Sequence, residues 1–256
     1  MDKGIGGLMR YAITICYDGE AYYGFQRQEG LPTIQQKLEE AISTKLNKPT
    51  EIVASGRTDA GVHALGQVAH FDSDVELDCD NFGYSINTLL PHDIAIVCCR
   101  KVRDDFHARF DAKSKTYRYR IILSKIHRPI ERRYFHICFY DLDVDKMREA
   151  CKYLIGEHDF RSFMLTDNTK ENTVRTIYDL HIECDEDKGI IDVVVKGNGF
   201  LHNMVRNIAG TLVDVGRGRF SPEQVEDILK AQKRSAAGKT LEGKALYLES
   251  VEYENF

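Results

Sequence analysis

The 256-residue chain lacks the long apolar stretches and the short motifs that mark several large classes of protein. No apolar run approaches the roughly 18 to 20 residues that a membrane span needs. Residues 1–7 contain no apolar core of a secretory signal peptide. There is neither a P-loop nor the glycine fingerprint of dinucleotide-binding folds. We therefore expect no membrane span and no nucleotide cofactor.

Cysteine pairs with metal-ligand or redox spacing are also absent. The seven cysteines are scattered, none lies in a C-x-x-C pair, and most occur in apolar runs. This pattern is typical of small buried hydrophobic residues in a reducing cytoplasm. His63 and His70 are close in sequence, but no cysteine or second cluster completes four ligands. We expect a cytoplasmic protein without a metal.

The net charge of −5 does not by itself indicate a nucleic-acid-binding protein, but the distribution of charge does. Residues 100–133 contain twelve Lys or Arg and four Asp or Glu, a local surplus of eight positive charges. A basic groove on an otherwise acidic protein gives this asymmetry. A surface strand with charges of alternating sign is the alternative.

The order of apolar patterns predicts an α+β fold. The first half is predicted to form strand, helix, strand, strand, helix, strand, at 11–17, 33–46, 51–54, 67–72, 79–90 and 94–102. This is the split βαβ, or ferredoxin-like, order. The second half repeats the outline, with strands at 113–123, 134–139, 174–183, 190–196 and 246–253 and helices at 144–155, 200–215 and 222–231. The boundary near Asp111 gives domains 9–111 and 112–256.

Residues 54–67 form the most distinctive stretch, a glycine-rich loop between two apolar runs. Three glycines give its backbone unusual freedom, and Arg57 and Asp59 place a cation and a carboxylate two residues apart. A loop fixed between buried strands is a common position for catalytic groups. The alternative is an aspartate that caps a turn beside a solvated arginine.

Residues 115–120 alternate aromatic and cationic side chains. On a strand, Tyr117 and Tyr119 would share one face, and Arg118 and Arg120 the other. Tyrosine rings can stack on exposed bases while arginines hold phosphates. A sheet with a half-buried tyrosine pair would give the same pattern.

A Gly-Asn-Gly turn at 197–199 precedes the helix predicted at 200–215. His202 and Arg206 are four residues apart, so they would lie on one helical face. The backbone N–H groups at the start of such a helix can bind an anion. An ordinary amphipathic helix is the alternative.

Residues 56–64, Gly-Arg-Thr-Asp-Ala-Gly-Val-His-Ala, closely resemble the active-site loop of the tRNA pseudouridine synthase A family. The similarity extends from Tyr11 to about Tyr253 and includes residues 17–19, 23–28, 115–120 and 197–210. The family usually has Trp where this chain has Phe25, so an aromatic ring is retained. Near the C-terminus the family's Thr-Ala-Pro and following Gly are replaced by residues 240–245, which alters the segment that leads to Leu246.

The resemblance assigns roles to particular side chains. It implies that Asp59 is the catalytic nucleophile, that Tyr117 stacks on the target uracil and that Leu246 lines the uracil pocket. It also implies that Arg206 pairs with the catalytic carboxylate. Arg206 is then the second arginine of the predicted catalytic site, beside Arg57 on the loop. An arginine within about 4 to 6 Å favours the ionised form of a carboxylate. Arg118 and His202 complete the predicted substrate contacts.

The resemblance further implies the fold and the reaction. The expected fold is two ferredoxin-like (RRM-like) halves with antiparallel sheets and an active-site cleft between them. The expected reaction converts uridine to pseudouridine at positions 38–40 of the tRNA anticodon arm, in a homodimer, without metal or cofactor. One alternative is a non-catalytic RNA-binding protein that uses the same basic groove. Another is an aspartate-nucleophile hydrolase, although no Asp-x-Asp metal signature accompanies Asp59.

Overall fold

The computed structural model describes residues 7–165 and 172–254, which group into two compact units. One unit contains residues 7–113 and 248–254, and the other contains the described residues between 114 and 247. The expected boundary near Asp111 is two residues before this division. The expected second domain, 112–256, differs more, because the chain from Leu248 onward groups with the first unit.

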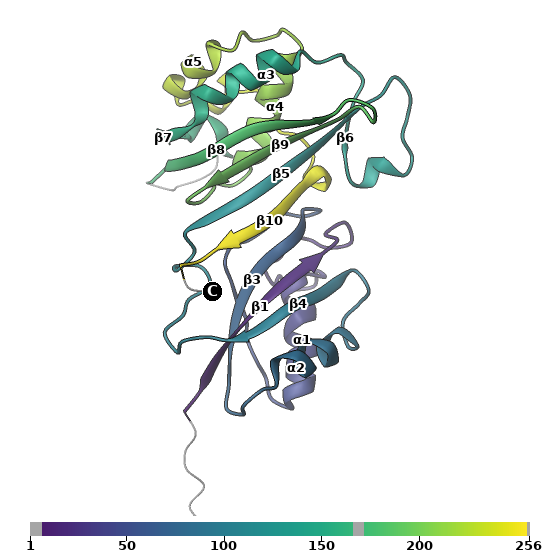
Figure 1. Cartoon of the computed structure of the whole chain (residues 1–256), viewed down its shortest axis with the longest axis vertical. Coiled ribbons are helices and arrows are strands. Elements are labelled where there is room, and N and C mark those ends of the chain that lie inside the picture. The colour runs from purple at the N-terminus through teal and green to yellow at the C-terminus, as the bar shows by residue number, and fades with distance from the viewer. Residues whose placement is uncertain (1–6, 166–171, 255–256) are drawn as a thin grey trace, which may run out of the picture. The chain divides into compact units, whose positions relative to one another are not determined.

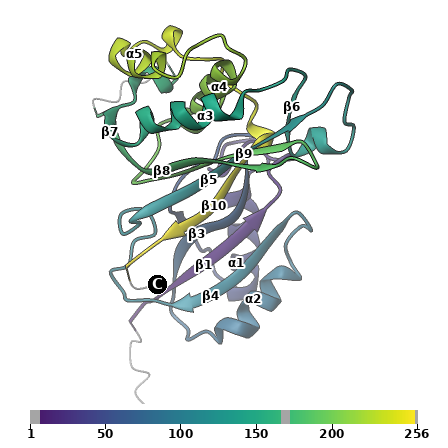
Figure 2. The same ribbon diagram turned by 45° about the horizontal axis from the view of Figure 1, so that its top comes forward.

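The first unit is an antiparallel sheet with two helices. Its elements in chain order are β1 (Met9–Tyr17), α1 (Ile34–Leu46), β2 (Val53–Ala54), β3 (His63–Ser73), α2 (Cys79–Asn87) and β4 (Ile94–Lys101). The strand order is β4-β1-β3, and β2 pairs with β3. Both helices lie on the same face of this sheet (Figures 1 and 2). The predicted order of elements is therefore confirmed for this unit.

Aromatic rings form the contact between α2 and the first sheet. Tyr11 of β1 stacks on Phe71 of β3 with ring centroids 5.8 Å apart, and Phe71 stacks on Phe82 of α2 at 5.6 Å. All three side chains are buried. Offset ring pairs of this kind add to the free energy gained by burying their apolar area.

Helix α1 begins where the sequence predicts. Thr33 is its N-cap, and the Thr33 hydroxyl accepts a hydrogen bond from the backbone N–H of Gln36. This bond satisfies one of the N–H groups that a helix start leaves without a partner. The helix ends at Asn47, which adopts the left-handed conformation with φ 52°.

The second unit contains the remaining elements. These are β5 (Ser114–Leu123), β6 (His136–Cys138), α3 (Val144–Cys151), β7 (Gly156–Asp159), β8 (Val174–Asp185), β9 (Ile190–Gly197), α4 (Met204–Gly216), α5 (Gln224–Ala231) and the start of β10 (Leu246–Glu252). The strand order is β5-β9-β8-β7, and these pairs are antiparallel. Helices α3, α4 and α5 lie on one face of this sheet (Figure 2).

Two expectations for the second unit are wrong. The sheet is not wholly antiparallel, because β6 runs parallel to β5. The chain between them, residues 124–135, is long enough to return β6 in the same direction. No strand is predicted between the helix at 144–155 and the strand at 174–183, yet β7 forms at Gly156–Asp159 and pairs with β8. Helix α3 itself ends at Cys151 and continues as a 3-10 turn to Leu154.

Within residues 7–165 and 172–254, no helix has the length and apolar character required to cross a membrane. All seven cysteines are free thiols.

Two helical glycines provide a matched test of how closely α4 packs. A Cβ added to Gly210 would lie 1.8 Å from the carbonyl oxygen of Lys239, whereas one added to Gly83 of α2 would lie 3.8 Å from Ile96. Because the added methyl group would overlap the Lys239 carbonyl, we expect Gly210→Ala to lower the unfolding free energy by at least about 1–3 kcal/mol. We expect Gly83→Ala to raise it by about 1 kcal/mol through helix propensity.

Urea unfolding of both variants beside the wild type measures the two changes. Equal effects of the two substitutions would contradict the close contact between α4 and the segment that contains Lys239.

Candidate functional site

The structure places Arg57 and Asp59 on the loop that joins β2 to β3. Arg57 is exposed and Asp59 is half-buried. Across the described parts of the chain, no hydrogen bond or ion pair holds the Arg57 side chain. The backbone N–H of Val62 donates to the carbonyl of Asp59 at 3.2 Å, so a turn follows the carboxylate immediately. The sequence prediction of a strand-loop-strand unit is confirmed.

A neighbouring turn, residues 18–25, supports this loop from one side. Phe25 N–H donates to the carbonyl of Thr58 at 3.0 Å, and Gly61 N–H donates to the carbonyl of Tyr22 at 3.3 Å. Gly24 has φ +91°, and a Cβ there would lie 2.7 Å from the Thr58 carbonyl oxygen. Only glycine permits both this φ and this approach. The two backbone segments therefore hold each other in place.

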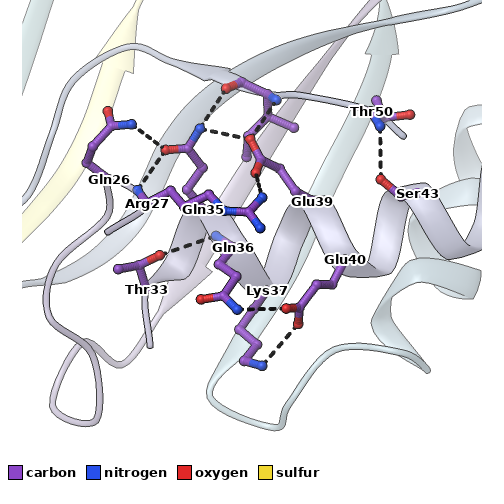
Figure 3. A network of polar contacts seen from close by, with 11 residues as sticks. Gln26, Arg27, Thr33, Gln35, Gln36, Lys37, Glu39, Glu40, Ser43 and Thr50 are labelled. Carbon is purple, nitrogen blue, oxygen red and sulfur yellow. Dashed lines mark hydrogen bonds and ion pairs between the residues drawn. The ribbon is translucent and has the colours of Figure 1, made fainter. Parts of the chain in front are cut away.

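Helix α1 supports the same region from a second side (Figure 3). The Gln35 side chain accepts hydrogen bonds from Gln26 and from the backbone of Arg27, and it donates to Glu39 at 2.8 Å. Glu39, only 6% exposed, forms an ion pair with Arg27 and accepts from the backbone of Ile52. Through these contacts α1 fixes the segment after Gly24 and the residue just before β2.

In the second unit, β5 shows the predicted alternation. Tyr117 and Tyr119 are buried, and the Tyr117 ring meets Phe200 edge to face with centroids 5.1 Å apart. Burial raises the pKa of Tyr119 well above its ordinary range, so this phenol stays neutral and donates to the carbonyl of Glu242. Arg118 and Arg120 are on the opposite face of the strand, as expected.

The Arg118 side chain is paired with two carboxylates of the neighbouring strands. Its guanidinium forms ion pairs with Glu183 of β8 and, at 3.1 Å, with Asp192 of β9. The hydrogen bond from Arg118 holds the pKa of Glu183 below its ordinary value. Arg120 also pairs with Asp192, at 3.2 Å. A phosphate would have to compete with two carboxylates for Arg118.

The same neutralisation extends along the basic segment 100–133. Cations in both units form ion pairs with nearby acids: Lys101, Arg103, Lys113, Arg118, Arg120, Lys125 and Arg128. Apart from the pairs with Asp192, which is buried, these are surface ion pairs that contribute roughly 0–1 kcal/mol each, so a polyanion can displace them. The sequence count of surplus charge therefore overstates the positive charge that is free of local partners.

His202 does not lie on a helix, contrary to expectation. Helix α4 begins at Met204, and its N-cap Asn203 adopts the left-handed conformation with φ 62°. This turn separates His202, which is exposed, from the helical face that carries Arg206. The i, i+4 argument applies only to helical residues, so it does not place these two side chains together.

Arg206 is fixed at the first turn of α4. Its Nε donates to the carbonyl of Leu241 at 2.7 Å, and its Nη1 donates to the Asn203 side chain at 2.6 Å. The carbonyl acceptor belongs to the segment that departs from the family pattern. After a 3-10 turn at Gly243–Ala245, that segment leads into Leu246, the buried first residue of β10.

Residues 240–245 are anchored by a polar cluster that the sequence pattern does not predict. Asn207, fully buried, accepts hydrogen bonds from Arg234 at 3.0 Å and from Thr240 at 2.6 Å, and Arg234 also donates to Thr240 at 2.8 Å. The side-chain amide of Asn207 donates to the carbonyl of Phe163. A polar residue in the apolar stripe of α4 was the available signal, since buried amides require partners.

The two histidines near the loop, His63 and His70, each contact a backbone N–H group. Nδ1 of His63 is 3.1 Å from both the Gly19 backbone nitrogen and an Asp18 carboxylate oxygen. Nδ1 of His70 accepts a hydrogen bond from Ala108 N–H at 3.1 Å. Within residues 7–165 and 172–254, no group of three or more His, Cys, Asp and Glu is arranged to hold a metal ion.

Comparison with known proteins identifies relatives over nearly the whole chain. The model of the family described as tRNA pseudouridine synthase matches residues 13–111 and 150–254. Asp59, Arg57, Arg206, His202 and Leu246 fall inside these ranges, and Tyr117 and Arg118 fall between them.

Two curated relatives are the tRNA pseudouridine synthase A proteins of Bacillus licheniformis and Bacillus subtilis. Each is 45% identical over 249 residues, which is 96% of this chain and 100% of the relative. Among solved structures, the archaeal box H/ACA sRNP Nop10-Cbf5 complex contains a chain that aligns with a TM-score of 0.37 and 15% identity. That alignment covers 88% of this chain and 59% of the other.

Burial makes His70 a source of pH-dependent stability. Its pKa is lowered to about 4, first by burial and then by Arg10 and His107, against opposing contributions from Asp72 and Asp111. The unfolded chain has a His pKa near 6.5, so protonation favours unfolding. The stability contributed by neutral His70 is complete above about pH 6.5 and is lost as the pH falls towards 4.

We expect the wild type to lose about 2 kcal/mol more unfolding free energy than His70→Asn between pH 7.5 and pH 5.0. Urea unfolding at both pH values provides the comparison, and other titrating groups cancel in the difference. Parallel losses in the two proteins would show that His70 is not the group responsible.

Proposed function

Because the chain belongs to the tRNA pseudouridine synthase A family, we propose that Asp59 is the nucleophile with which it converts uridine to pseudouridine in the tRNA anticodon arm. The target positions proposed are 38–40. The chain is a tRNA pseudouridine synthase, an isomerase. The observation that carries the assignment of Asp59 is its place on a loop held by backbone hydrogen bonds to residues 18–25, while α1 bonds to Arg27 and to Ile52 just before β2.

The reaction explains why a fixed carboxylate beside arginine suits this chemistry. The bond between ribose C1′ and uracil N1 breaks, the base rotates, and C1′ is rejoined to C5, which loses its proton while N1 gains one. The atoms of the nucleotide are only rearranged, so the reaction requires no redox carrier. A carboxylate nucleophile must be ionised, and a guanidinium can hold it in that state with two parallel hydrogen bonds. Arg206 is proposed for this role.

The proposal also includes the finer architecture. We propose two ferredoxin-like halves with the active site in a cleft between them. The order β4-β1-β3 with β2 beside β3 supports a ferredoxin-like topology for the first unit, and the order β5-β9-β8 supports one for the second. In this arrangement Asp59 and Arg57 come from the first half, and Tyr117, Leu246 and Arg206 come from the second.

The remaining substrate contacts have unequal support. Tyr117 is proposed to stack on the target uracil and Leu246 to line its pocket, while His202 contacts the RNA from the exposed turn before α4. Arg118 is proposed to bind phosphate, which requires exchange of its pairs with Glu183 and Asp192. A homodimer and a cytoplasmic location complete the proposal.

Replacement of the nucleophile tests the central assignment. We expect Asp59→Asn to abolish pseudouridine formation while tRNA affinity and unfolding free energy stay close to the wild type, because the side chain keeps its size. Release of tritium from C5-labelled uridine in tRNA measures turnover. Asp74→Asn, which changes an exposed carboxylate just after β3, is the matched control.

Substantial turnover by Asp59→Asn would refute the assignment. Absence of tritium release from the wild type, together with tight tRNA binding, would instead support the alternative of a non-catalytic RNA-binding protein.

Arg57 is proposed to help a stem-paired uridine leave the base stack. Flipping a nucleotide costs a few kcal/mol, and a long side chain beside the nucleophile can occupy the vacated space or hold the flipped phosphate. We expect Arg57→Ala to slow reaction at a paired stem uridine far more than at an unpaired loop uridine. Single-turnover rates on two anticodon-arm RNAs measure the difference, with Arg148→Ala, which changes an exposed arginine of α3, as the control. Equal losses on both RNAs would assign Arg57 to orienting Asp59 instead.

A further inference from the structure

Under the Asp59 loop lies a set of buried polar side chains to which the proposed reaction assigns no role. Along residues 55–59 the chain alternates between interior and surface. Ser55 is 0% and Thr58 is 6% exposed, whereas Arg57 is exposed and Asp59 half-buried. The loop is thus held by its inward residues, and the two candidate reacting groups are on its outer side.

Thr58, the residue just before the candidate nucleophile, is bound at both its side chain and its backbone. Its hydroxyl and the Tyr17 phenol form a buried hydrogen bond of 2.8 Å. Its carbonyl accepts from Phe25 N–H at 3.0 Å. Tyr17, 4% exposed, ends β1, and burial raises its pKa far above the physiological range, so the phenol remains a neutral hydrogen-bonding group.

Gln67 of β3 fixes the other end of the loop. This side chain is 0% exposed, accepts a hydrogen bond from the Ser55 hydroxyl at 2.7 Å and donates to the carbonyl of Gly56 at 2.9 Å. Its oxygen also accepts from Val68 N–H at 3.1 Å. Buried polar groups are costly unless paired, so this arrangement resists any shift of residues 55 and 56.

We propose that Tyr17 and Thr58 are positioning residues for the reaction, because the hydrogen bond between them fixes the backbone from which Asp59 projects. The inference rests on the proposed function, since it presupposes that Asp59 attacks the nucleotide. With Gln67 holding residues 55 and 56, the Tyr17–Thr58 bond is the second fixed point of the loop. Asp59 then has little freedom beyond its own side-chain rotation.

The physical reason is the steep dependence of covalent attack on geometry. Reacting atoms must approach within about 3–3.5 Å with aligned orbitals, and a misplacement of 1 Å can cost about a hundredfold in rate. Loss of the Tyr17–Thr58 bond leaves a buried hydroxyl without this hydrogen bond, which is unfavourable in free energy. We expect the backbone at Thr58 to shift, and the shift passes directly to the next residue, Asp59.

Three substitutions test this hydrogen bond, and the two at Thr58 are the more specific, because the Tyr17 phenol also contacts the Gln67 side chain. Thr58→Val preserves the branched shape but removes the hydroxyl, Thr58→Ser keeps the hydroxyl, and Tyr17→Phe removes the phenol oxygen. The measurements are the single-turnover rate of tritium release with saturating enzyme, the Kd for tRNA and the urea unfolding free energy. All are made with the full chain at a temperature where every variant is folded.

A matched control exists on the same strand. Tyr11 is a tyrosine of β1 that is 0% exposed, and its phenol accepts a hydrogen bond from Leu77 N–H at 2.9 Å. Tyr11→Phe therefore removes a buried phenol oxygen from β1 without altering the contacts of the Asp59 loop. It reports how much a loss of stability alone changes the rate.

We expect Thr58→Val and Tyr17→Phe each to slow single turnover by tenfold to a hundredfold. Thr58→Ser is expected to restore the rate to within about threefold of the wild type, with Kd values within about twofold throughout. The double variant should be no slower than Tyr17→Phe alone, because Tyr17→Phe removes the bond that Thr58→Val removes, together with the contact of the phenol with Gln67. Tyr11→Phe should lose stability but not rate.

The inference is overturned if Thr58→Val reacts at the wild-type rate, or if Tyr11→Phe slows the reaction as much as Tyr17→Phe does. If Tyr17→Phe fails to fold, the comparison of Thr58→Val with Thr58→Ser decides alone. Failure of the proposed function looks different, because Asp59→Asn would then retain turnover. An inactive Asp59→Asn together with a fully active Thr58→Val would reject only the positioning role.

Discussion

The close approach of two backbone segments, residues 18–25 and residues 56–62, is the constraint on which the candidate site depends. There is no room for a side chain between the two segments at Gly24, because a Cβ there would lie too close to the Thr58 carbonyl oxygen. The positive φ of Gly24 also disfavours any other residue. Backbone hydrogen bonds in both directions then connect them. A carboxylate on such a loop is positioned mainly by the main chain, which is less mobile than a long side chain on an open surface.

Rules that act within a few residues predicted much of the fold. The apolar pattern at 33–46 predicted α1, and the alternation of tyrosine and arginine predicted the two faces of β5. The start of α4 was predicted wrongly because nothing in the apolar spacing reveals that Asn203 adopts a left-handed conformation. Asparagine is among the few residues that do so at low cost, so composition allowed the turn without requiring it.

The candidate site was predictable in its residues but not in its supports. Asp59 stands out on its loop, whereas Gln67 and Asn207 become informative only once their full burial is known. The same holds for charge. Arg118 counts as a surplus cation in the sequence, but its acidic partners, Glu183 and Asp192, lie more than sixty residues away along the chain. Long-range pairing of this kind is set by strand register, which periodicity does not specify.

The last strand has a consequence for how the protein is made. Residues 248–254 group with the first unit, where Val251 and Tyr253 pack against the cluster of Ala12, Val68, Phe106 and Ala108. The Tyr253 phenol also donates to the carbonyl of Ala108. N-terminal domains generally fold first during synthesis. Here the first unit stays incomplete until residues 248–254 have been synthesised, so the sheet that carries the Asp59 loop can finish folding only after the whole second unit has been made.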